Sequence, residues 1–157
     1  MAFEFRTTRL VEFSETDMAG IVHFTNFYRY MEQAEHAFYR ELGISVVMDV
    51  EGQRISFPRV HASCDFRKPL RFEDTVEIRV IVREKKAKSF TFDFLFTRLP
   101  RGDSDQSEEV ARGRMTVVCV AKDAAAGTMK AVDIPRAIGE RIEAAPAELL
   151  ASLDAGP

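Results

Sequence analysis

The chain has 157 residues, a hydrophobic fraction of 46%, a charged fraction of 30% and a formal net charge of −3. This length fits one domain that buries roughly 70% of its unfolded surface, so no disulfide or metal is needed for stability. The acidic balance argues against a general electrostatic grip on nucleic acid, and the lack of an 18-residue apolar run predicts no transmembrane helix. We expect one domain over residues 1–145 and a frayed, Ala-rich tail over residues 146–157.

The N-terminal residues and the cysteines favour a cytoplasmic setting. Residues 1–17 alternate in polarity and include acidic residues, unlike the basic and then apolar layout of a signal peptide. Cys64 and Cys119 lie far apart in the sequence, form no CxxC pair and fall in expected strands, so we interpret them as buried free thiols. Free thiols are usual in a reducing compartment.

A strand, a loop and a long helix are predicted for the first part of the chain. Residues 4–13 predict a strand, and the polar stretch SETDMAGIVHFTN that follows predicts a loop with its bend at Gly20. From Asn26 to Leu42 the apolar residues recur with a period of 3.6, which predicts an amphipathic helix. Asn26 is expected to cap its start and Gly43 to follow its end. Residues 45–51 are expected to form one short further helix.

From Arg54 onward the apolar period changes to two, which predicts strands. The strands are connected by a tight polar turn at 84–88, by an acidic hairpin loop at 101–109 and by a turn at Gly127. Pro135 is expected to start a short final helix. One strand, one long helix and about four further antiparallel strands make an α+β layout, with the helix lying across a curled sheet.

The side chains of two expected strands alternate between a core face and an outer face. The alternating Phe row from Phe90 to Phe96 is expected in the core, together with the Val row from Val76 to Val82. Ile81 and Leu95 then point to the outer face and leave it partly apolar. Such a face favours a second subunit, most commonly in a closed dimer.

Asp17 is the sharpest candidate for chemistry, because it lies in the loop just before the long helix. The N–H groups at a helix start carry partial positive charge and can receive a carbonyl oxygen that becomes an oxyanion. A carboxylate beside them can attack the acyl carbon or act as a base on water. The spacing alone equally allows Asp17 to cap a turn.

Other titratable residues give weaker signals. His23, in the same loop, is either a packed imidazole or a pocket wall that contacts substrate or orients Asp17. His36 and Glu32 lie four residues apart on the helix, but a metal would need further ligands, so we expect no metal and no cofactor. Lys86 and Lys88 lie on a basic hairpin tip, which is either a solvated turn or a clamp for a nucleotide phosphate.

The stretch VEFSETDMAGIVHFTNFYRYMEQAEHAFYRELGI resembles the signature of the 4-hydroxybenzoyl-CoA thioesterase family of hot-dog proteins. The positions that match this signature are Asp17, Gly20, Ile21, Val22, Asn26 and Gly43. Three further stretches, residues 57–74, 88–90 and 131–135, are similar to later parts of the family, so the resemblance covers nearly the whole chain. Many bacterial members have Tyr-His where this chain has His23-Phe24, so the family's His role is not assigned to His23.

The resemblance implies a hot-dog fold, in which a five- or six-stranded antiparallel sheet wraps a long central helix. It implies an acyl-CoA thioesterase for 4-hydroxybenzoyl-CoA or another aromatic or aliphatic acyl-CoA, with a site between the subunits of a homodimer that often pairs into a homotetramer. Asp17 would be the catalytic carboxylate, and the backbone N–H of Phe24 would polarise the carbonyl. The residues implied in binding are Gly20, His23, Thr25, Asn26, Phe57 and Pro58 for the substrate, and Lys86 and Lys88 for the CoA phosphates.

Two other functions stay open on the same fold. The chain could be a non-catalytic module that binds acyl-CoA or an acyl carrier, although such a module has no need of a loop carboxylate beside a carbonyl site. It could also be a hydratase or dehydratase, which uses a His with an acidic partner. His23 and Asp17 are close enough in the sequence for that chemistry.

Overall fold

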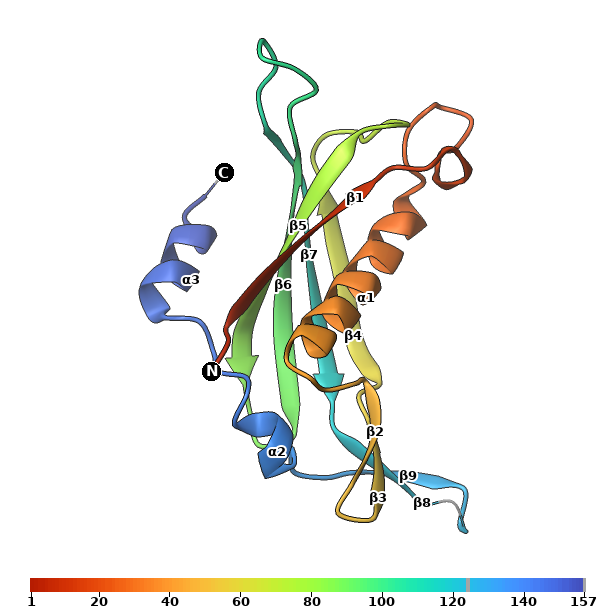
Figure 1. The fold of residues 1–157 in the computed structure, drawn as a ribbon, viewed down its shortest axis with the longest axis vertical. Helices are drawn as coiled ribbons and strands as arrows, with labels where there is room; N and C mark the ends of the chain where they lie inside the picture. Colours follow the sequence, from red (N-terminus) through yellow and green to blue (C-terminus); the bar gives the residue numbers. More distant parts are fainter. Residues whose placement is uncertain (124, 157) are drawn as a thin grey trace.

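The computed structural model describes residues 1–123 and 125–156 as one long helix with two antiparallel sheets and two short helices (Figure 1). In chain order the elements are β1 (Glu4–Leu10), the 3-10 turn η1 (Phe13–Glu15), α1 (Phe24–Glu41), β2 (Val47–Val50), β3 (Gln53–Ser56), β4 (Arg59–Phe66), β5 (Thr75–Lys85), β6 (Ser89–Arg98), β7 (Glu108–Val118), β8 (Val120–Asp123), β9 (Thr128–Ala131), α2 (Arg136–Gly139) and α3 (Ala147–Asp154). The larger sheet has the strand order β1-β5-β6-β7-β4, and the smaller one has the order β2-β3-β8-β9. Two positions in expected features, Ala124 near the Gly127 turn and Pro157 in the tail, lie outside the described residues.

Helix α1 packs across the inner face of the five-stranded sheet, and the core lies between them (Figure 1). Its buried face includes Phe27, Met31 and Phe38, and the expected Phe row on β6 faces it. All four rings of that row, Phe90, Phe92, Phe94 and Phe96, are 0% exposed. Burying one such ring contributes roughly 1.5–3 kcal/mol, so this helix–sheet contact contributes strongly to stability.

The closest approach of helix and sheet requires a glycine. A Cβ added to Gly113 on β7 would lie 2.2 Å from the Sδ atom of Met31, and Met31 is fully buried. A larger side chain at this position would therefore push α1 away from the sheet. Gly113 keeps the helix in the position that also sets where its N-terminal end lies.

The α+β hot-dog layout predicted from the sequence is confirmed, with five strands in the sheet that carries the helix. Gly43 follows the helix with φ +71°, and Gly127 turns the chain between β8 and β9 with φ +64°, as the sequence predicted. Within the described residues, no helix is long and apolar enough to cross a membrane.

Two local predictions were wrong. Within residues 45–51, Val47–Val50 form the strand β2 and not a helix, because these residues pair with β3 and complete the small sheet. The helix starts at Phe24 with His23 as its cap, two residues before the expected start, because the His23 ring accepts a hydrogen bond from the Thr25 N–H.

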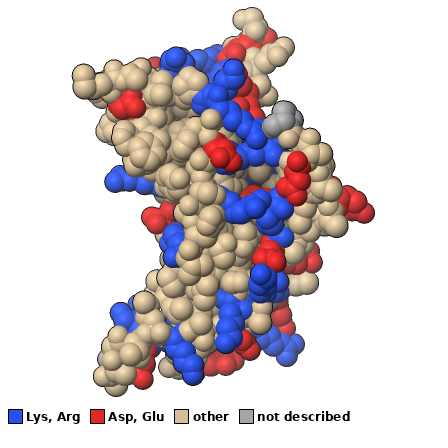
Figure 2. All heavy atoms as spheres, turned by 180° about the vertical axis from the view of Figure 1, so that it is seen from behind, with Lys and Arg blue, Asp and Glu red and all other residues tan. Residues whose placement is uncertain are grey.

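The C-terminal tail, expected to be frayed, forms the helix α3 against the outer face of the large sheet. Leu149, Leu150 and Leu153 lie on one side of α3 and pack around Ile81 and Leu95. The outer apolar residues from which a second subunit was expected are therefore covered by the chain's own tail. Seen from behind, the face beside α3 is hollowed and carries basic and acidic side chains in close alternation (Figure 2).

A buried acid connects α1 to the edge strand β4. Glu35 is 0% exposed, and Arg59 of β4 donates to its Oε2 atom at 2.6 Å. Its Oε1 atom and the hydroxyl of Tyr39 have no hydrogen-bond partner within the described part of the chain. Burial raises the pKa of Glu35 to about 7, although the Arg59 charge opposes this rise, and burial also lowers the pKa of His36 beside it.

This raised pKa predicts a stability that falls with rising pH. Between the ordinary pKa of Glu35, 4.5, and its folded pKa of about 7, the unfolded chain releases a proton that the folded protein keeps. The free energy of unfolding should therefore fall across this window by up to roughly 3 kcal/mol from Glu35 alone. Urea unfolding of the wild type and of Glu35→Gln from pH 4.5 to 8 should show a steeper fall for the wild type. Parallel pH profiles would contradict the role of Glu35.

Candidate active site

The carboxylate of Asp17 is held in a tight turn between η1 and α1. The Asp17 N–H donates to the Ile21 carbonyl at 2.9 Å, and the Gly20 N–H donates to the Asp17 carbonyl at 3.0 Å. Gly20 has φ +78°, which a residue with a side chain rarely adopts, so the bend predicted there is confirmed. The Asp17 Oδ1 atom accepts from the Ala19 N–H at 2.8 Å, and among the described residues its Oδ2 atom has no hydrogen-bond partner. One carboxylate oxygen is thus positioned while the other is available for chemistry.

The first turn of α1 offers a free backbone donor. The Thr25 N–H donates to the Nδ1 atom of His23 at 3.3 Å, and the Asn26 N–H donates to the His23 carbonyl at 2.9 Å. The Thr25 hydroxyl lies 2.7 Å from the same Nδ1 atom. No acceptor for the Phe24 N–H is found in the described residues. This N–H lies at the positive end of the helix dipole, where a carbonyl oxygen is stabilised.

Three hydrogen bonds fix the start of α1 to other segments. The Val22 N–H donates to the Leu70 carbonyl at 2.8 Å, and the His23 N–H donates to the Glu15 carbonyl at 2.9 Å. The side-chain Nδ2 of Asn26 donates to the same Glu15 carbonyl at 2.8 Å. Asn26 therefore does not cap the helix but ties its first turn to the segment that precedes Asp17.

Asp17 and Phe24 line one open cavity of about 560 Å³. Its apolar wall is formed by Ile21, Val22, Phe24, Phe27, Phe66, Pro69 and Leu70, and its charged residues are Asp17, Arg67, Lys68 and Arg71. The rings of Phe27 and Phe66 meet edge to face with centroids 5.2 Å apart. Phe24 and Phe66 are 56% and 47% exposed, so two aromatic rings stand at the opening. The cavity can hold a flat apolar group beside a carboxylate and a free N–H.

The structure brings together only part of the predicted site. Asp17 and Phe24 both line the cavity, and Gly20, His23, Thr25 and Asn26 shape the loop and helix start beside it without lining it. Two other predicted groups lie near the far end of α1 within one chain (Figure 1). These are Phe57 and Pro58, with Phe57 packed between Tyr39 and Phe90, and the lysines Lys86 and Lys88 on the β5–β6 hairpin.

The sequence analysis missed the cations beside Asp17. Arg67, Lys68 and Arg71 follow β4 and lie at the cavity, where the backbone N–H groups of Arg67 and Lys68 both donate to the Val110 carbonyl. The signal was the stretch Arg67-Lys68-Pro69-Leu70-Arg71, with three cations in five residues after a strand. Its position next to Asp17 depends on the contact between Val22 and Leu70, which no local pattern reveals. Across the described residues, no cluster of three or more His, Cys, Asp or Glu side chains could hold a metal ion.

Related sequences carry the names of esterases and CoA-thioester hydrolases. A putative esterase from Aquifex aeolicus is 34% identical over 95 residues, which cover 60% of this chain and 72% of that protein. A 1,4-dihydroxy-2-naphthoyl-CoA hydrolase from Prochlorococcus marinus is 30% identical over 97 residues, which cover 57% of this chain and 64% of that protein. The match thus spans less than two thirds of the length of this hydrolase.

Solved structures show the same fold, and a family model matches most of the chain. A gentisyl-coenzyme A thioesterase is 31% identical with a TM-score of 0.68, over 86% of this chain and 99% of that one. The 4-hydroxybenzoyl-CoA thioesterase from a Pseudomonas species, at 20% identity, has a TM-score of 0.75 over 89% of this chain and 99% of that one, which shows the shared fold. The model of the thioesterase-like superfamily matches residues 11–145. The family resemblance predicted from the sequence is confirmed, and the chain belongs to the thioesterase-like superfamily.

Proposed function

We propose that this protein hydrolyses the thioester of an acyl-CoA, with Asp17 as nucleophile or general base. Water and R–CO–S–CoA would give the free acid and CoA. The observation that carries the proposal is one apolar cavity lined both by Asp17, whose carboxylate has one unpaired oxygen among the described residues, and by Phe24, the first residue of α1. Thioester hydrolysis of an acyl-CoA is also the reaction named for the gentisyl-CoA and 1,4-dihydroxy-2-naphthoyl-CoA relatives.

The chemistry needs few side chains. The thioester carbonyl would accept a hydrogen bond from the Phe24 N–H, and the oxyanion that forms would be stabilised there by roughly 2.7–4 kcal/mol. The free oxygen of Asp17 would attack the carbonyl carbon and form an anhydride that water opens, or it would take a proton from the attacking water. The thiolate of CoA leaves readily, since thiols have a pKa of about 8.5. No separate general acid is therefore required.

We propose an aromatic acyl group as the substrate class. The rings of Phe24, Phe27 and Phe66 offer faces and edges to a flat ring in the cavity. The acyl groups in the names of several relatives, gentisyl, 1,4-dihydroxy-2-naphthoyl and 4-hydroxybenzoyl, are all aromatic. An aliphatic acyl group would contact the same apolar wall but would gain no ring–ring contact there.

Replacing Asp17 tests the chemistry directly. Asp17→Asn keeps the acceptor for the Ala19 N–H but removes the nucleophile or base, so kcat should fall at least about 100-fold. Free thiol release from a panel of aromatic and aliphatic acyl-CoAs measures this change. Asp49→Asn, on the exposed strand β2, is the charge-matched control. Hydrolysis near the wild-type rate in Asp17→Asn would show that the catalytic assignment is wrong.

The predicted alternatives differ in what they require of His23. A hydratase or dehydratase would use its imidazole as an acid or base, whereas the structure uses Nδ1 as the helix cap. A binding module would release no thiol from any acyl-CoA. Thioester hydrolysis is favoured because Asp17 and Phe24 line the apolar cavity, whereas His23 does not line it.

Two substitutions of His23 separate capping from acid–base chemistry. His23→Ala should lower the free energy of unfolding by about 0.5–2 kcal/mol, because the Thr25 N–H loses its acceptor. His23→Asn, which can still cap, should keep both the stability in urea and the rate of thiol release. If His23→Asn is as stable as the wild type but as inactive as Asp17→Asn, the result would instead support acid–base chemistry by His23.

We further propose a homodimer as the minimal unit, with the homotetramer predicted from the family as a further assembly. Strand β4 is an edge of the large sheet, and most of its residues are exposed, with Val60 at 64%. An unpaired edge of this kind is a template for pairing with another strand. Antiparallel pairing of two β4 strands would carry the far end of one copy toward the Asp17 end of the other. The lysine hairpin and Phe57-Pro58 could then serve the site of the second copy.

If Lys86 and Lys88 bind the phosphates of CoA as a clamp, their loss should affect the binding of the acyl-CoA alone. Replacing both Lys86 and Lys88 by Ala should raise KM for an acyl-CoA with little change in kcat, because phosphate contacts bind substrate and transition state equally. The N-acetylcysteamine thioester of the same acid, which lacks the phosphates, should be unaffected. Replacing Lys122 and Lys130 on the small sheet by Ala gives a charge-matched control. A large loss of kcat in the first variant would contradict the clamp.

The cysteines take no part in the proposed reaction. Cys64 and Cys119 are free, and burial raises their pKa values to about 12 and about 11, respectively. Neither thiol is therefore a reactive thiolate at neutral pH. Two free, unreactive thiols suit the reducing cytoplasm, which we propose as the location.

A further inference from the structure

The guanidinium of Arg67 lies at the cavity that holds Asp17 and is only partly paired. It lines the cavity, its side chain is 34% exposed, and it makes no side-chain hydrogen bond to any described residue. Its ion-pair partner is Glu109, with the Nη1 and Oε1 atoms 3.4 Å apart. That distance is longer than the 2.7–2.9 Å typical of a charge-assisted hydrogen bond, so the pair is incomplete.

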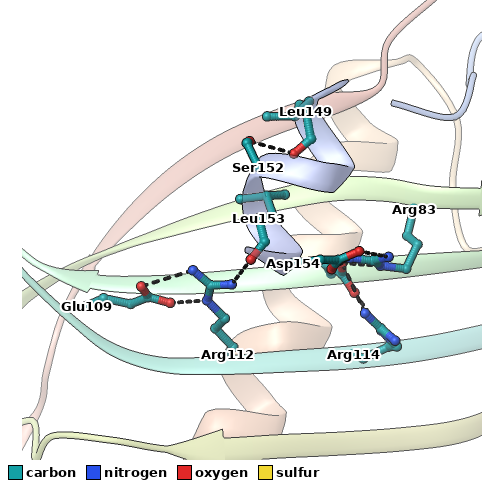
Figure 3. Close-up of polar contacts among 9 residues, drawn as sticks. Arg83, Glu109, Arg112, Arg114, Leu149, Ser152, Leu153 and Asp154 are labelled. Carbon is teal, nitrogen blue, oxygen red and sulfur yellow. Dashed lines mark hydrogen bonds and ion pairs between the residues drawn. The ribbon is translucent and has the colours of Figure 1, made fainter. Parts of the chain in front are cut away.

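Glu109 is incompletely paired with Arg67 because Arg112 binds it from the outer face of the sheet. The Arg112 Nε atom donates to Oε1 of Glu109, and Nη2 donates to Oε2 at 3.2 Å (Figure 3). This two-point contact uses the planar fork of a guanidinium against both oxygens of a carboxylate. Arg112 therefore engages both carboxylate oxygens of Glu109, and Arg67 shares only Oε1 with it at the longer distance.

Helix α3 holds Arg112 in this position. The remaining Nη1 atom of Arg112 donates to the Leu153 carbonyl at 2.6 Å, near the C-terminal end of α3, where a cation is favoured (Figure 3). The same end of α3 is fixed by Arg83, whose Nη1 atom donates to Asp154 at 3.2 Å. Helix α3 begins at Ala147, beyond the residues that the superfamily model matches. Helix α3, which lies outside the family match, thus affects through Arg112 and Glu109 how Arg67 is paired at the candidate site.

Because the Arg67–Glu109 ion pair is long and includes no hydrogen bond, the guanidinium of Arg67 retains donors for another anion. If Arg112 were absent, Glu109 could offer both oxygens to Arg67 and neutralise it. With Arg112 in position, Arg67 keeps its donors for an anion that enters the cavity. Lys68 and Arg71 add positive charge nearby, although Lys68 is shared with Glu108 at 3.9 Å.

We propose that Arg67 receives an anionic group of the ligand, and that Arg112, held by α3, is a positioning residue that keeps Glu109 from competing for Arg67. The identity of the ligand rests on the proposed function. The anionic group is either a phosphate of CoA or an acidic substituent on an aromatic acyl group. Both would form the same charge-assisted hydrogen bonds with the guanidinium.

Isothermal titration calorimetry with two probes tests this proposal and distinguishes the two sources. Coenzyme A carries the phosphates without an acyl group, and benzene-1,4-dicarboxylate carries an aromatic carboxylate without phosphates. For the probe that contacts Arg67, Arg67→Gln and Arg112→Gln should each weaken binding about threefold, the scale of an exposed ion pair. Adding Glu109→Gln to Arg112→Gln should restore the binding, because the competing carboxylate is then gone.

Arg114→Gln is the matched control, because it removes the same charge from β7 and its partner is Asp93, not Glu109 or the end of α3. Its binding of both probes should equal that of the wild type. The proposal is overturned if Arg67→Gln binds both probes with the affinity of the wild type, or if the wild type and Arg67→Gln both fail to bind either probe. It is also overturned if adding Glu109→Gln to Arg112→Gln does not restore binding. Binding of these probes requires no hydrolysis. If the variants bind the probes as predicted but the protein releases no thiol from any acyl-CoA, the proposed reaction is refuted and this inference stands.

Discussion

The start of helix α1 is the constraint on which the candidate site depends. Backbone hydrogen bonds from Val22 to Leu70 and from His23 to Glu15 fix it between the segment before Asp17 and the segment after β4. Packing of α1 on the Phe row, with Gly113 allowing the close approach, fixes the rest of the helix. The core and the loop contacts therefore determine together where the first N–H groups of α1 point. The reaction proposed here uses that direction.

A site built this way needs few catalytic side chains. Backbone groups do most of the positioning, since the Ala19 N–H holds one oxygen of Asp17 and the Phe24 N–H is left free. A thioester suits such a site because its leaving group needs no strong acid. Specificity then comes from the walls, where Phe24, Phe27 and Phe66 offer aromatic faces and the cations after β4 offer positive charge. Under the proposed function, a change in these walls would alter the substrate without altering the carboxylate or the helix end.

The sequence predicted those features that depend on local pattern. The period of 3.6 predicted the long helix, the period of two predicted the main strands, and the polar loop predicted the bend at Gly20. Asp17 came from the chemistry of that loop and Phe24 from the family resemblance; both line the cavity, and their roles are proposals. It failed where a distant contact decides the outcome. Residues 47–50 are a strand because β3 pairs with them, and the leucines of α3 form an ordered helix because Ile81 and Leu95 receive them. Arg67 joins the site only through the folding of β4 beside the loop, so its role could not be read from its neighbours in the chain.

The most direct test of the account is whether the Phe24 N–H binds the thioester carbonyl. The Asp17→Asn variant, labelled with nitrogen-15, would be titrated with the acyl-CoA that the wild type hydrolyses fastest, and its amide resonances would be followed by NMR. The account predicts that the Phe24 amide proton moves downfield as it gains an acceptor, while the amide of Gly102, in the loop between β6 and β7, stays unchanged. A Phe24 resonance that does not move while the ligand is bound would contradict the account.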